Sequence, residues 1–577
     1  MSSITTVVFF YLCCAFSFVS NAQEEISRSQ FPSGFFFGAA TSSYQIEGAV
    51  LEDGRGLNNW DAFSHTQGKI FNGDNADVAD DHYHRYEEDI ELMHTLGINA
   101  YRLSISWTRI LPRGRFGDVN SNGIMFYNKL IDNLLLRGIE PFVTISHHDI
   151  PLELEDRYQS WLSPLIQDDF VYYADICFKS FGDRVKYWIT INEPNLFVRN
   201  AYKMGIYPPG RCSAPFGNCS SGDSETEPIV ATHNMIISHA KAATIYKKHY
   251  QAQQGGYIGI LPHASAFLPI SDDEADREAA NRAMAFSIPW IFDPLLHGDY
   301  PPEMRLCLGD RLPKFSHEER NMMKDSLDYI AINHYATFYA KDCMHSTSES
   351  GCHAIEGFML TLSENNGVLI GERARHPQPT GTTPVLIQEV RIKTLAHLFC
   401  LSRIRAVLYV RRPLSVSISA KELTTAFPSF FVVPYGLEKI IEYLKERYNN
   451  IRPMFVLENG MAQADEPVEK HNELLQDIKR VNYHKSYLAS LLRAMRNGAD
   501  VRGYFVWSLI DNFEWTSGYK LRFGLYYVDY LTLKRTPKAS AKWYKDFLTN
   551  GTHAEQAAIK TSTSKNQDVT ATVLKEE

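Results

Sequence analysis

The sequence lacks three features that would point to other classes of protein. Its net charge is −9 over 577 residues and no basic stripe dominates it, which argues against a nucleic-acid-binding surface. Beyond the N-terminus no stretch approaches eighteen consecutive apolar residues, so we expect no membrane span in the mature chain. No glycine-rich phosphate loop follows the first expected strand. What is present, 44% hydrophobic and 22% charged residues, is ordinary for a globular protein with a large core.

The first 22 residues carry no charged side chain. They contain an apolar run from Val7 to Val19 and end with the small residues Ser20 and Ala22. This pattern is typical of a secretory signal peptide that is cleaved before Gln23, although no Lys or Arg stands at its start. We therefore expect residues 1–22 to be removed and the mature chain to enter the secretory pathway, with the cell exterior, cell wall or vacuole as its destination.

Cysteine usage agrees with secretion. Cys13 and Cys14 are removed with the expected signal peptide. The remaining cysteines include two closely spaced pairs, Cys212 with Cys219 and Cys343 with Cys352. In an oxidising compartment we expect each pair to form a local disulfide, with free buried thiols as the alternative.

Two further features fit a secreted protein. Asn218 and Asn550 each begin an Asn-X-Ser/Thr triplet and are candidate glycosylation sites. Residues 551–577 are polar and lack periodicity, so we expect a disordered tail. The tail does not end in an endoplasmic-reticulum retention tetrapeptide.

Short apolar runs alternate with segments of helical periodicity through most of the chain. We expect strands at residues 35–40, 100–106, 141–146, 187–191, 257–261, 329–333, 454–457 and 503–508. Eight strands with intervening helices is the count of a (β/α)8 barrel, here a single catalytic domain over residues 23–550. A doubly wound open sheet is the alternative.

One segment interrupts this alternation. Residues 374–424 contain eight Lys or Arg against two Asp or Glu, whereas the chain as a whole is acidic. A structureless loop of that length is unusual in a compact barrel. A surface insertion and a mispredicted exon are the two interpretations.

Polar and aromatic residues recur where the expected strands end. The carboxyl ends of barrel strands form the active face. The residues in or just after these ends are Gln45, Arg102, His147, Asn192, Glu193, Asn333, Tyr335, Glu458 and Trp507. Core packing alone does not explain so many polar groups at one end of the strands.

Two of these residues are carboxylates. Glu193 ends the stretch "YWITINEP" and Glu458 ends "MFVLE" before Asn-Gly. Paired acids across a pocket are the machinery of glycoside hydrolysis, in which one is protonated and the other is ionised. Mutual repulsion raises the pKa of one, and a nearby cation keeps the other charged. Arg102 is a candidate for that cation.

Six motifs carry a resemblance to a known family. "TINEPN", "VLENG", "WSLIDNFEW", "YRLSISW", "INHY" and "SYQIEG" resemble glycoside hydrolase family 1, the β-glucosidases, in their plant secretory form. The likeness covers about residues 30–547 apart from the insertion. It implies a retaining β-glucosidase that removes terminal β-D-glucosyl residues from small glucosides. It also implies that catalysis uses no metal or other cofactor.

The resemblance assigns a role to each matching residue. It makes Glu193 the general acid/base and Glu458 the nucleophile, with Arg102 and Asn333 supporting the nucleophile. The residues expected to bind substrate are Gln45, His147, Asn192, Tyr335, Trp507, Glu514, Trp515 and Phe523. Trp507, Glu514 and Trp515 also suit a sugar on physical grounds, since its apolar faces need aromatic rings and its hydroxyls need polar partners.

The type of residue at position 193 bears on the substrate. Plant thioglucosidases of the family look different here, with Gln, because a thioglucoside leaving group needs no protonation. The presence of Glu193 therefore favours an O-glycoside.

Three positions depart from the family pattern. His148 stands where a Trp usually follows the sugar-binding His, Leu457 replaces a more polar residue, and Ser429 replaces a Trp that forms the aglycone platform. A catalytically silent barrel that binds glycosides or proteins is therefore an alternative. Transglucosylation, or a sugar other than glucose, is another. The aglycone and the oligomeric state stay open, with a homodimer as one option.

Overall fold

A computed structural model describes residues 26–344, 352–371, 430–465 and 471–549. The expected signal peptide, the segment 374–424, Ser429, Asn550 and the tail 551–577 lie outside these ranges.

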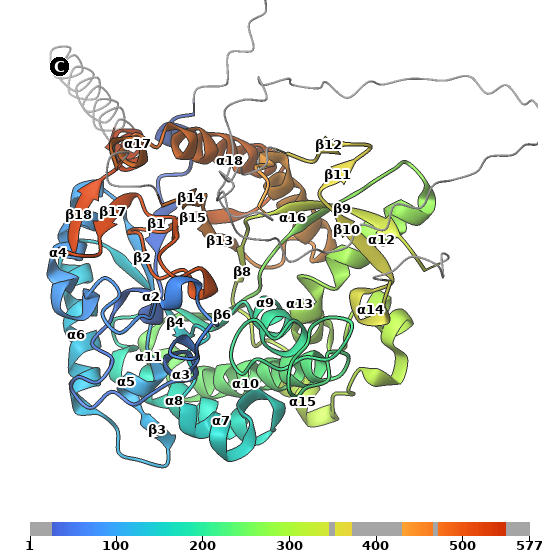
Figure 1. Cartoon of the computed structure of the whole chain (residues 1–577), viewed down its shortest axis with the longest axis horizontal. Helices are drawn as coiled ribbons and strands as arrows, with labels where there is room; N and C mark the ends of the chain where they lie inside the picture. Colours follow the sequence, from blue (N-terminus) through green and yellow to red (C-terminus); the bar gives the residue numbers. More distant parts are fainter. Residues whose placement is uncertain (1–25, 345–351, 372–429, 466–470, 550–577) are drawn as a thin grey trace, which may run out of the picture.

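Eight parallel strands form one sheet that curls into a barrel (Figure 1). Their order around the sheet is β6-β5-β4-β2-β1-β15-β13-β8. They are β1 (Phe36–Ala40), β2 (Ala100–Ser104), β4 (Glu140–Ser146), β5 (Tyr187–Asn192), β6 (Tyr257–Leu261), β8 (Ile330–Asn333), β13 (Met454–Asn459) and β15 (Val501–Trp507). The two edge strands are β6 and β8. A hydrogen bond links them just beyond the end of β6, where the backbone N–H of Ala264 donates to the carbonyl of Asn333 at 2.8 Å. The predicted barrel is confirmed, and the strand ends differ from the expected ones by only a few residues.

Helices surround the strands, as Figure 1 shows. The longer ones are α4 (His82–Leu96), α6 (Ser121–Leu136), α8 (Leu165–Phe181), α10 (Glu227–His249), α16 (Pro434–Arg447) and α18 (Ile478–Arg496). In α16 the buried residues Leu437, Ile440, Ile441 and Leu444 recur at helical spacing. This helix therefore covers the barrel with one apolar face.

Aromatic and aliphatic side chains fill the barrel interior. The ring of Phe142 stacks on Tyr187 with centroids 4.2 Å apart. Leu457 belongs to the same apolar cluster and is fully buried. Its departure from the family pattern therefore concerns core packing, and the side chain takes no part in the pocket. A Cβ on Gly38 would lie 2.4 Å from the ring of Phe505, so this position needs glycine.

The connections after β5, β6 and β8 carry extra elements beyond the strand ends. They include α9 (Pro194–Val198), the π-helix η4 (Arg199–Lys203), α12 (Glu274–Ala285), α13 (Pro289–His297), α14 (Pro302–Leu308) and α15 (His317–Met323). A three-stranded sheet joins β7 (Ala266–Pro269), β9 (Thr337–Asp342) and β10 (Met359–Leu362). These elements build the walls above the barrel mouth.

The described chain also contains shorter α-helices and strands. They are α2 (Ser43–Ile46), α3 (Asn59–Ser64), α5 (Trp107–Ile110), β3 (Pro112–Arg115), α7 (Leu152–Tyr158), α11 (Gln251–Gln254), β11 (Glu364–Asn365), β12 (Val368–Leu369), β14 (Gln463–Ala464), α17 (His471–Leu475), β16 (Leu521–Arg522), β17 (Tyr526–Asp529) and β18 (Lys534–Pro537).

Both predicted disulfides are present. Cys212 bonds Cys219, and Cys343 bonds Cys352. Asn218 is exposed in the first of these loops, which is compatible with the predicted glycosylation. Within the described ranges, none of the helices combines the length and apolar character needed to cross a bilayer.

The described chain stops at Gly371 and resumes at Phe430, and its two sides meet. A Cβ added to Gly371 would lie 2.8 Å from the carbonyl oxygen of Val432. Gly371 and Val432, on the two sides of this gap in the described chain, therefore lie next to each other.

Candidate active site

A pocket of about 670 Å³ opens at the carboxyl ends of the barrel strands. Most of the predicted site residues line it: Gln45, His147, Glu193, Tyr335, Glu458, Trp507, Glu514, Trp515 and Phe523. The other three, Arg102, Asn192 and Asn333, are fully buried and contact the carboxylates that line the pocket or each other. The fold thus brings together every residue that the sequence predicted for catalysis and substrate binding.

Glu458 is turned into the pocket by an irregularity in β13. The register with β8 shifts between Val456 and Glu458, which places Glu458 opposite Asn333. Such bulges next to functional sites re-aim a side chain. The carboxylate forms an ion pair with Arg102 and accepts a hydrogen bond from the Tyr335 hydroxyl at 2.6 Å. Both of its oxygens are therefore held.

Arg102, on β2, is fixed on several sides. Besides Glu458, its guanidinium donates to the amide oxygen of Asn192 at 2.8 Å and to the hydroxyl of Thr144 at 2.9 Å. The side chain is completely buried. Arg102 is thus a positioned cation beneath the pocket.

Glu193 directly follows β5 in an unusual backbone conformation. Its φ of 42° and ψ of 51° lie in the left-handed region, which non-glycine residues adopt mainly where the surroundings enforce it, often at active sites. Its N–H donates to the carbonyl of Leu261 at 2.6 Å. The turn ends the strand and directs the carboxylate toward the barrel axis.

A hydrogen-bonded network joins the two carboxylates. The amide of Asn333 donates to Glu193 Oε1 and to Asn192 Oδ1, each at 3.1 Å. Asn192 in turn accepts from Arg102, which pairs with Glu458. Movement of one carboxylate is therefore coupled to the position of the other.

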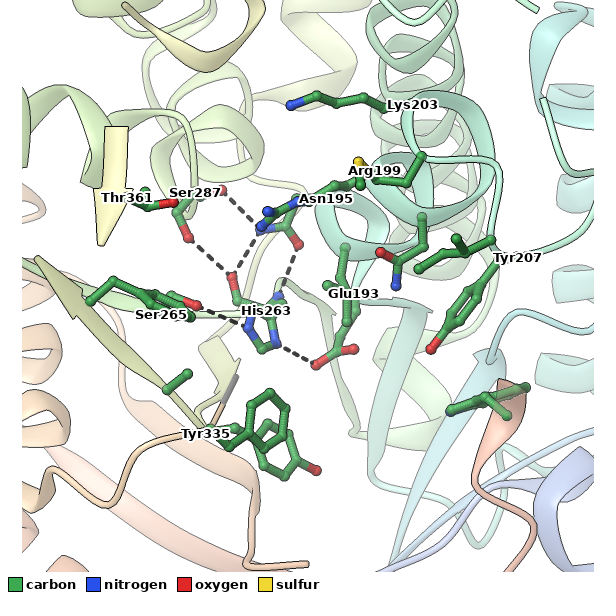
Figure 2. Close-up of a pocket in the computed structure, with 18 of the residues that line it drawn as sticks. Glu193, Asn195, Arg199, Lys203, Tyr207, His263, Ser265, Ser287, Tyr335 and Thr361 are labelled. Carbon is green, nitrogen blue, oxygen red and sulfur yellow. Dashed lines mark hydrogen bonds and ion pairs between the residues drawn. The ribbon is translucent and has the colours of Figure 1, made fainter. Parts of the chain in front are cut away.

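The sequence analysis missed His263, which contacts one of the carboxylates directly. Its Nδ1 lies 3.0 Å from Glu193 Oε1 (Figure 2). His263 comes two residues after the expected strand 257–261, so a search for polar residues beyond every strand end would have found it.

The two carboxyl groups differ in pKa. Burial and the charge of Glu193 raise the pKa of Glu458 to about 7, against the opposing effect of Arg102. Burial also acts to raise the pKa of Glu193, but His263, His148 and Asn333 outweigh it, so this pKa is lowered. These pKa values favour a proton on Glu458 rather than on Glu193, the reverse of what the predicted roles require. For Glu193 to act as the acid, the proton has to pass from Glu458 to Glu193.

Aromatic faces and polar groups alternate around the inner pocket. The ring of His147 lies nearly parallel to those of Trp507 and Trp515, with centroids 6.0 Å away in each case. Burial and Arg102 hold the pKa of His147 well below its usual range, so its ring is neutral. The Gln45 amide donates to Glu514 Oε2 at 3.4 Å. This arrangement can hold a sugar ring by its faces and its hydroxyls.

The outer pocket is more apolar and was not predicted. Its walls include Phe286, Trp290, Phe338 and Met359, with Arg199 and Lys203 beside them. Lys203 forms an ion pair with Glu356. These residues come from the connections between strands, where no periodicity in the sequence marks a residue as lining a pocket.

His148 changes one wall of the pocket. Both of its ring nitrogens are buried without a hydrogen-bond partner among the described residues. Burial lowers its pKa to about 4, so the ring is neutral, and it packs against Phe197 with centroids 5.2 Å apart. The wall is therefore aromatic but polar.

Comparison with known proteins agrees with this geometry. The profile of "Glycosyl hydrolase family 1" matches residues 27–552. The chain belongs to glycosyl hydrolase family 1.

Its relatives are plant β-glucosidases. It is 44% identical to the "Coniferin beta-glucosidase" of Pinus contorta, over 98% of this chain and 99% of the relative. It is 48% identical to "Probable inactive beta-glucosidase 14" of Oryza sativa subsp. japonica, over 91% and 92%. The crystal structure of a rice β-glucosidase superimposes with a TM-score of 0.79 at 43% identity, covering 90% of this chain and 99% of that one.

Proposed function

We propose that this chain is a retaining β-glucosidase that hydrolyses terminal β-D-glucosyl residues from small O-glucosides. The observation that carries the proposal is the network that joins Glu193 and Glu458 through Asn333, Asn192 and Arg102 at the mouth of the barrel. Retaining glycosidases use two carboxyl groups about 5 to 5.5 Å apart, and we expect that separation here.

In the first step the Glu458 carboxylate attacks the anomeric carbon. Glu193 gives its proton to the glycosidic oxygen, and the carbon–oxygen bond breaks with its electron pair on the departing alcohol. The glucosyl unit is left as an ester of Glu458. Arg102 and Tyr335 hold the attacking carboxylate by bonds to its two oxygens.

In the second step water releases the sugar. Glu193, now ionised, takes a proton from the water as its oxygen attacks the anomeric carbon. The ester bond breaks and its electron pair returns to Glu458. Gln45, His147 and Glu514 bind sugar hydroxyls in both steps, and Trp507 supports the ring. The apolar outer pocket suits an aromatic aglycone.

The proposal is tested with an aryl β-glucoside and three proteins. We expect the wild-type chain to release the phenol and Glu458→Gln to lose about 10⁴-fold or more of the rate. Glu153→Gln is the control, because Glu153 is paired with Arg113 and Arg157 outside the pocket. Equal turnover by wild type and Glu458→Gln would refute the assignment.

A second candidate function is a silent barrel that binds glycosides without cleaving them. The polar wall at His148 and the relative named as probably inactive motivate it. A 2-fluoro-glucoside separates the two functions, because an active nucleophile traps it as an ester. Binding of glucosides without a mass increase on Glu458 favours the silent barrel.

A further inference from the structure

His263 lies against the predicted acid/base residue in a prepared position. Its Nδ1 is 3.0 Å from Glu193 Oε1, and its Nε2 is 3.1 Å from the Ser265 hydroxyl. Figure 2 shows the ring between these two partners, on the Glu193 side of the pocket. A histidine whose two nitrogens both have partners has a defined orientation.

The backbone of His263 is fixed as well. Its N–H donates to Asn195 Oδ1 at 2.9 Å, and the Asn195 amide donates to the carbonyl of His263 at 2.8 Å. The imidazole lies parallel to the ring of Tyr335, with an interplanar angle of 8° and centroids 6.2 Å apart. The position of Nδ1 is thus set by three separate elements of the fold.

This geometry distinguishes the two oxygens of Glu193. Oε1 faces both His263 Nδ1 and the Asn333 amide. Oε2 makes no hydrogen bond to any residue that the structure describes, and Glu193 lines the pocket. If the Ser265 hydroxyl donates to Nε2, the proton of a neutral imidazole is on Nδ1, where it donates to Oε1.

We propose that His263 is a positioning residue that holds Oε1 of Glu193 and leaves Oε2 to protonate the leaving group. The inference rests on the proposed glucosidase function. In the first step the proton on Oε2 passes to the glycosidic oxygen, while the Nδ1–H bond to Oε1 stabilises the charge that forms on Glu193. His263 stays outside the bond changes.

The other titratable groups near Glu193 and His263 do not take over the positioning role of His263. The groups that face Glu193 or His263 from neighbouring elements are His148, Tyr207, His334, Tyr335, Glu458 and Glu514. Burial lowers the pKa of His148 and of His334 to about 4, so both are neutral near pH 7. Burial raises the pKa of both tyrosines above their usual value, so they are neutral too. Among these described titratable neighbours, His263 is the one whose ring nitrogen lies within hydrogen-bond distance of Glu193.

The contact has a measurable consequence for the pH profile. His263 acts to lower the pKa of Glu193, so its removal raises that pKa. His263→Asn keeps an amide donor near the position of Nδ1, whereas His263→Phe keeps none. We expect the alkaline limb of kcat/KM, where Glu193 loses its proton, to move to higher pH in His263→Phe, by about half a pH unit or more.

The positioning role is measured with leaving groups of different basicity. His263→Phe removes one of the two contacts to Oε1 and leaves the Asn333 amide as the remaining donor. A 2,4-dinitrophenyl glucoside needs little protonation, whereas an alkyl glucoside needs full protonation. We expect His263→Phe to lose roughly 10- to 100-fold more rate on the alkyl glucoside than on the dinitrophenyl glucoside. In His263→Asn we expect the gap between the losses on the two substrates to be much smaller.

Active sites are counted in every variant by trapping with a 2-fluoro-glucoside, so unfolded protein does not enter the rates. His233→Asn is the matched control, since His233 contacts the Tyr300 hydroxyl at 2.9 Å outside the pocket. An unchanged alkaline limb in His263→Phe, together with equal losses on both substrates, overturns the proposal. A wild-type chain that cleaves neither substrate refutes the glucosidase function instead.

Discussion

Arg102 and Glu458 form an ion pair whose side chains are 0% and 5% exposed. An isolated buried carboxylate would be costly, and its pairing with a buried cation offsets that cost. The same guanidinium also donates to Asn192. Asn333 then links Asn192 to the second carboxylate, Glu193. One buried charge therefore organises both candidate catalytic groups.

Replacing Arg102 with Met is expected to impair both activity and folding. Without the cation, the pKa of Glu458 rises further above about 7. The ionised nucleophile then becomes scarcer at pH 6 to 7, and the acidic limb of kcat/KM moves to higher pH. Breaking a buried pair typically costs about 3–5 kcal/mol of the free energy of unfolding.

The measurements are a pH–rate profile and urea unfolding of the same preparations. Arg113→Met is the control, because Arg113 pairs with Glu153 on the surface, where such pairs contribute about 0–1 kcal/mol. An Arg102→Met protein with an unshifted acidic limb would contradict the assigned role.

Replacing Tyr335 with Phe removes one hydrogen bond and little volume. The hydroxyl donates to Glu458 Oε2 at 2.6 Å. Hydrogen bonds to charged groups contribute about 1.5–3 kcal/mol, so we expect kcat/KM to fall roughly 10- to 150-fold. Tyr83→Phe is the matched control, since Tyr83 donates to Asp53 at the same distance, outside the pocket. Equal rates in both variants would show that the contact does not serve the nucleophile.

The barrel strands were predictable because each is a short apolar run, and a polar residue lies at the end of most of them. The same pattern identified Glu193 and Glu458, whose neighbours in sequence are strand residues. Both disulfides followed from close spacing within a chain expected to be secreted.

The outer pocket could not be predicted in this way. Phe286 and Trp290 come from the connection after β6, and Phe338 and Met359 come from strands of the small sheet, so they meet only after folding. The difference in pKa between Glu193 and Glu458 could not be predicted either, because it depends on the 3.0 Å contact between His263 and Glu193. Residue types alone do not give such a distance.

Glu514 makes a testable contribution to the pH dependence of stability. Burial and the charges of Glu458 and Glu193 raise its pKa to about 8. In the unfolded chain a Glu ionises near pH 4.3, so between about pH 4.3 and 8 the folded state alone keeps this proton. The free energy of unfolding therefore falls as pH rises through that window, by about 1.4 kcal/mol per unit for one proton.

Glu514→Gln replaces this carboxyl group with an amide that does not titrate. We expect its melting temperature to fall less than that of the wild type between pH 5 and pH 8, while Glu458 and Asp149, with pKa values of about 7 and 8, still contribute. Thermal unfolding at several pH values measures the difference. Parallel curves for the two proteins would mean that Glu514 is ionised in the folded state throughout.

Deleting residues 374–424 is expected to leave the barrel intact. Gly371 and Val432 already lie in contact, so residues 372–373 and 425–429 suffice to connect them without strain. Shortening a loop whose ends stay in place lowers the entropic cost of closing it, by only about 0.6 kcal/mol per halving of its length. We expect the shortened chain to melt within a few degrees of the full chain and to cleave an aryl glucoside at least as fast. A shortened chain that fails to fold, while the full chain is active, would establish the segment as a working part of the enzyme and would exclude the mispredicted exon.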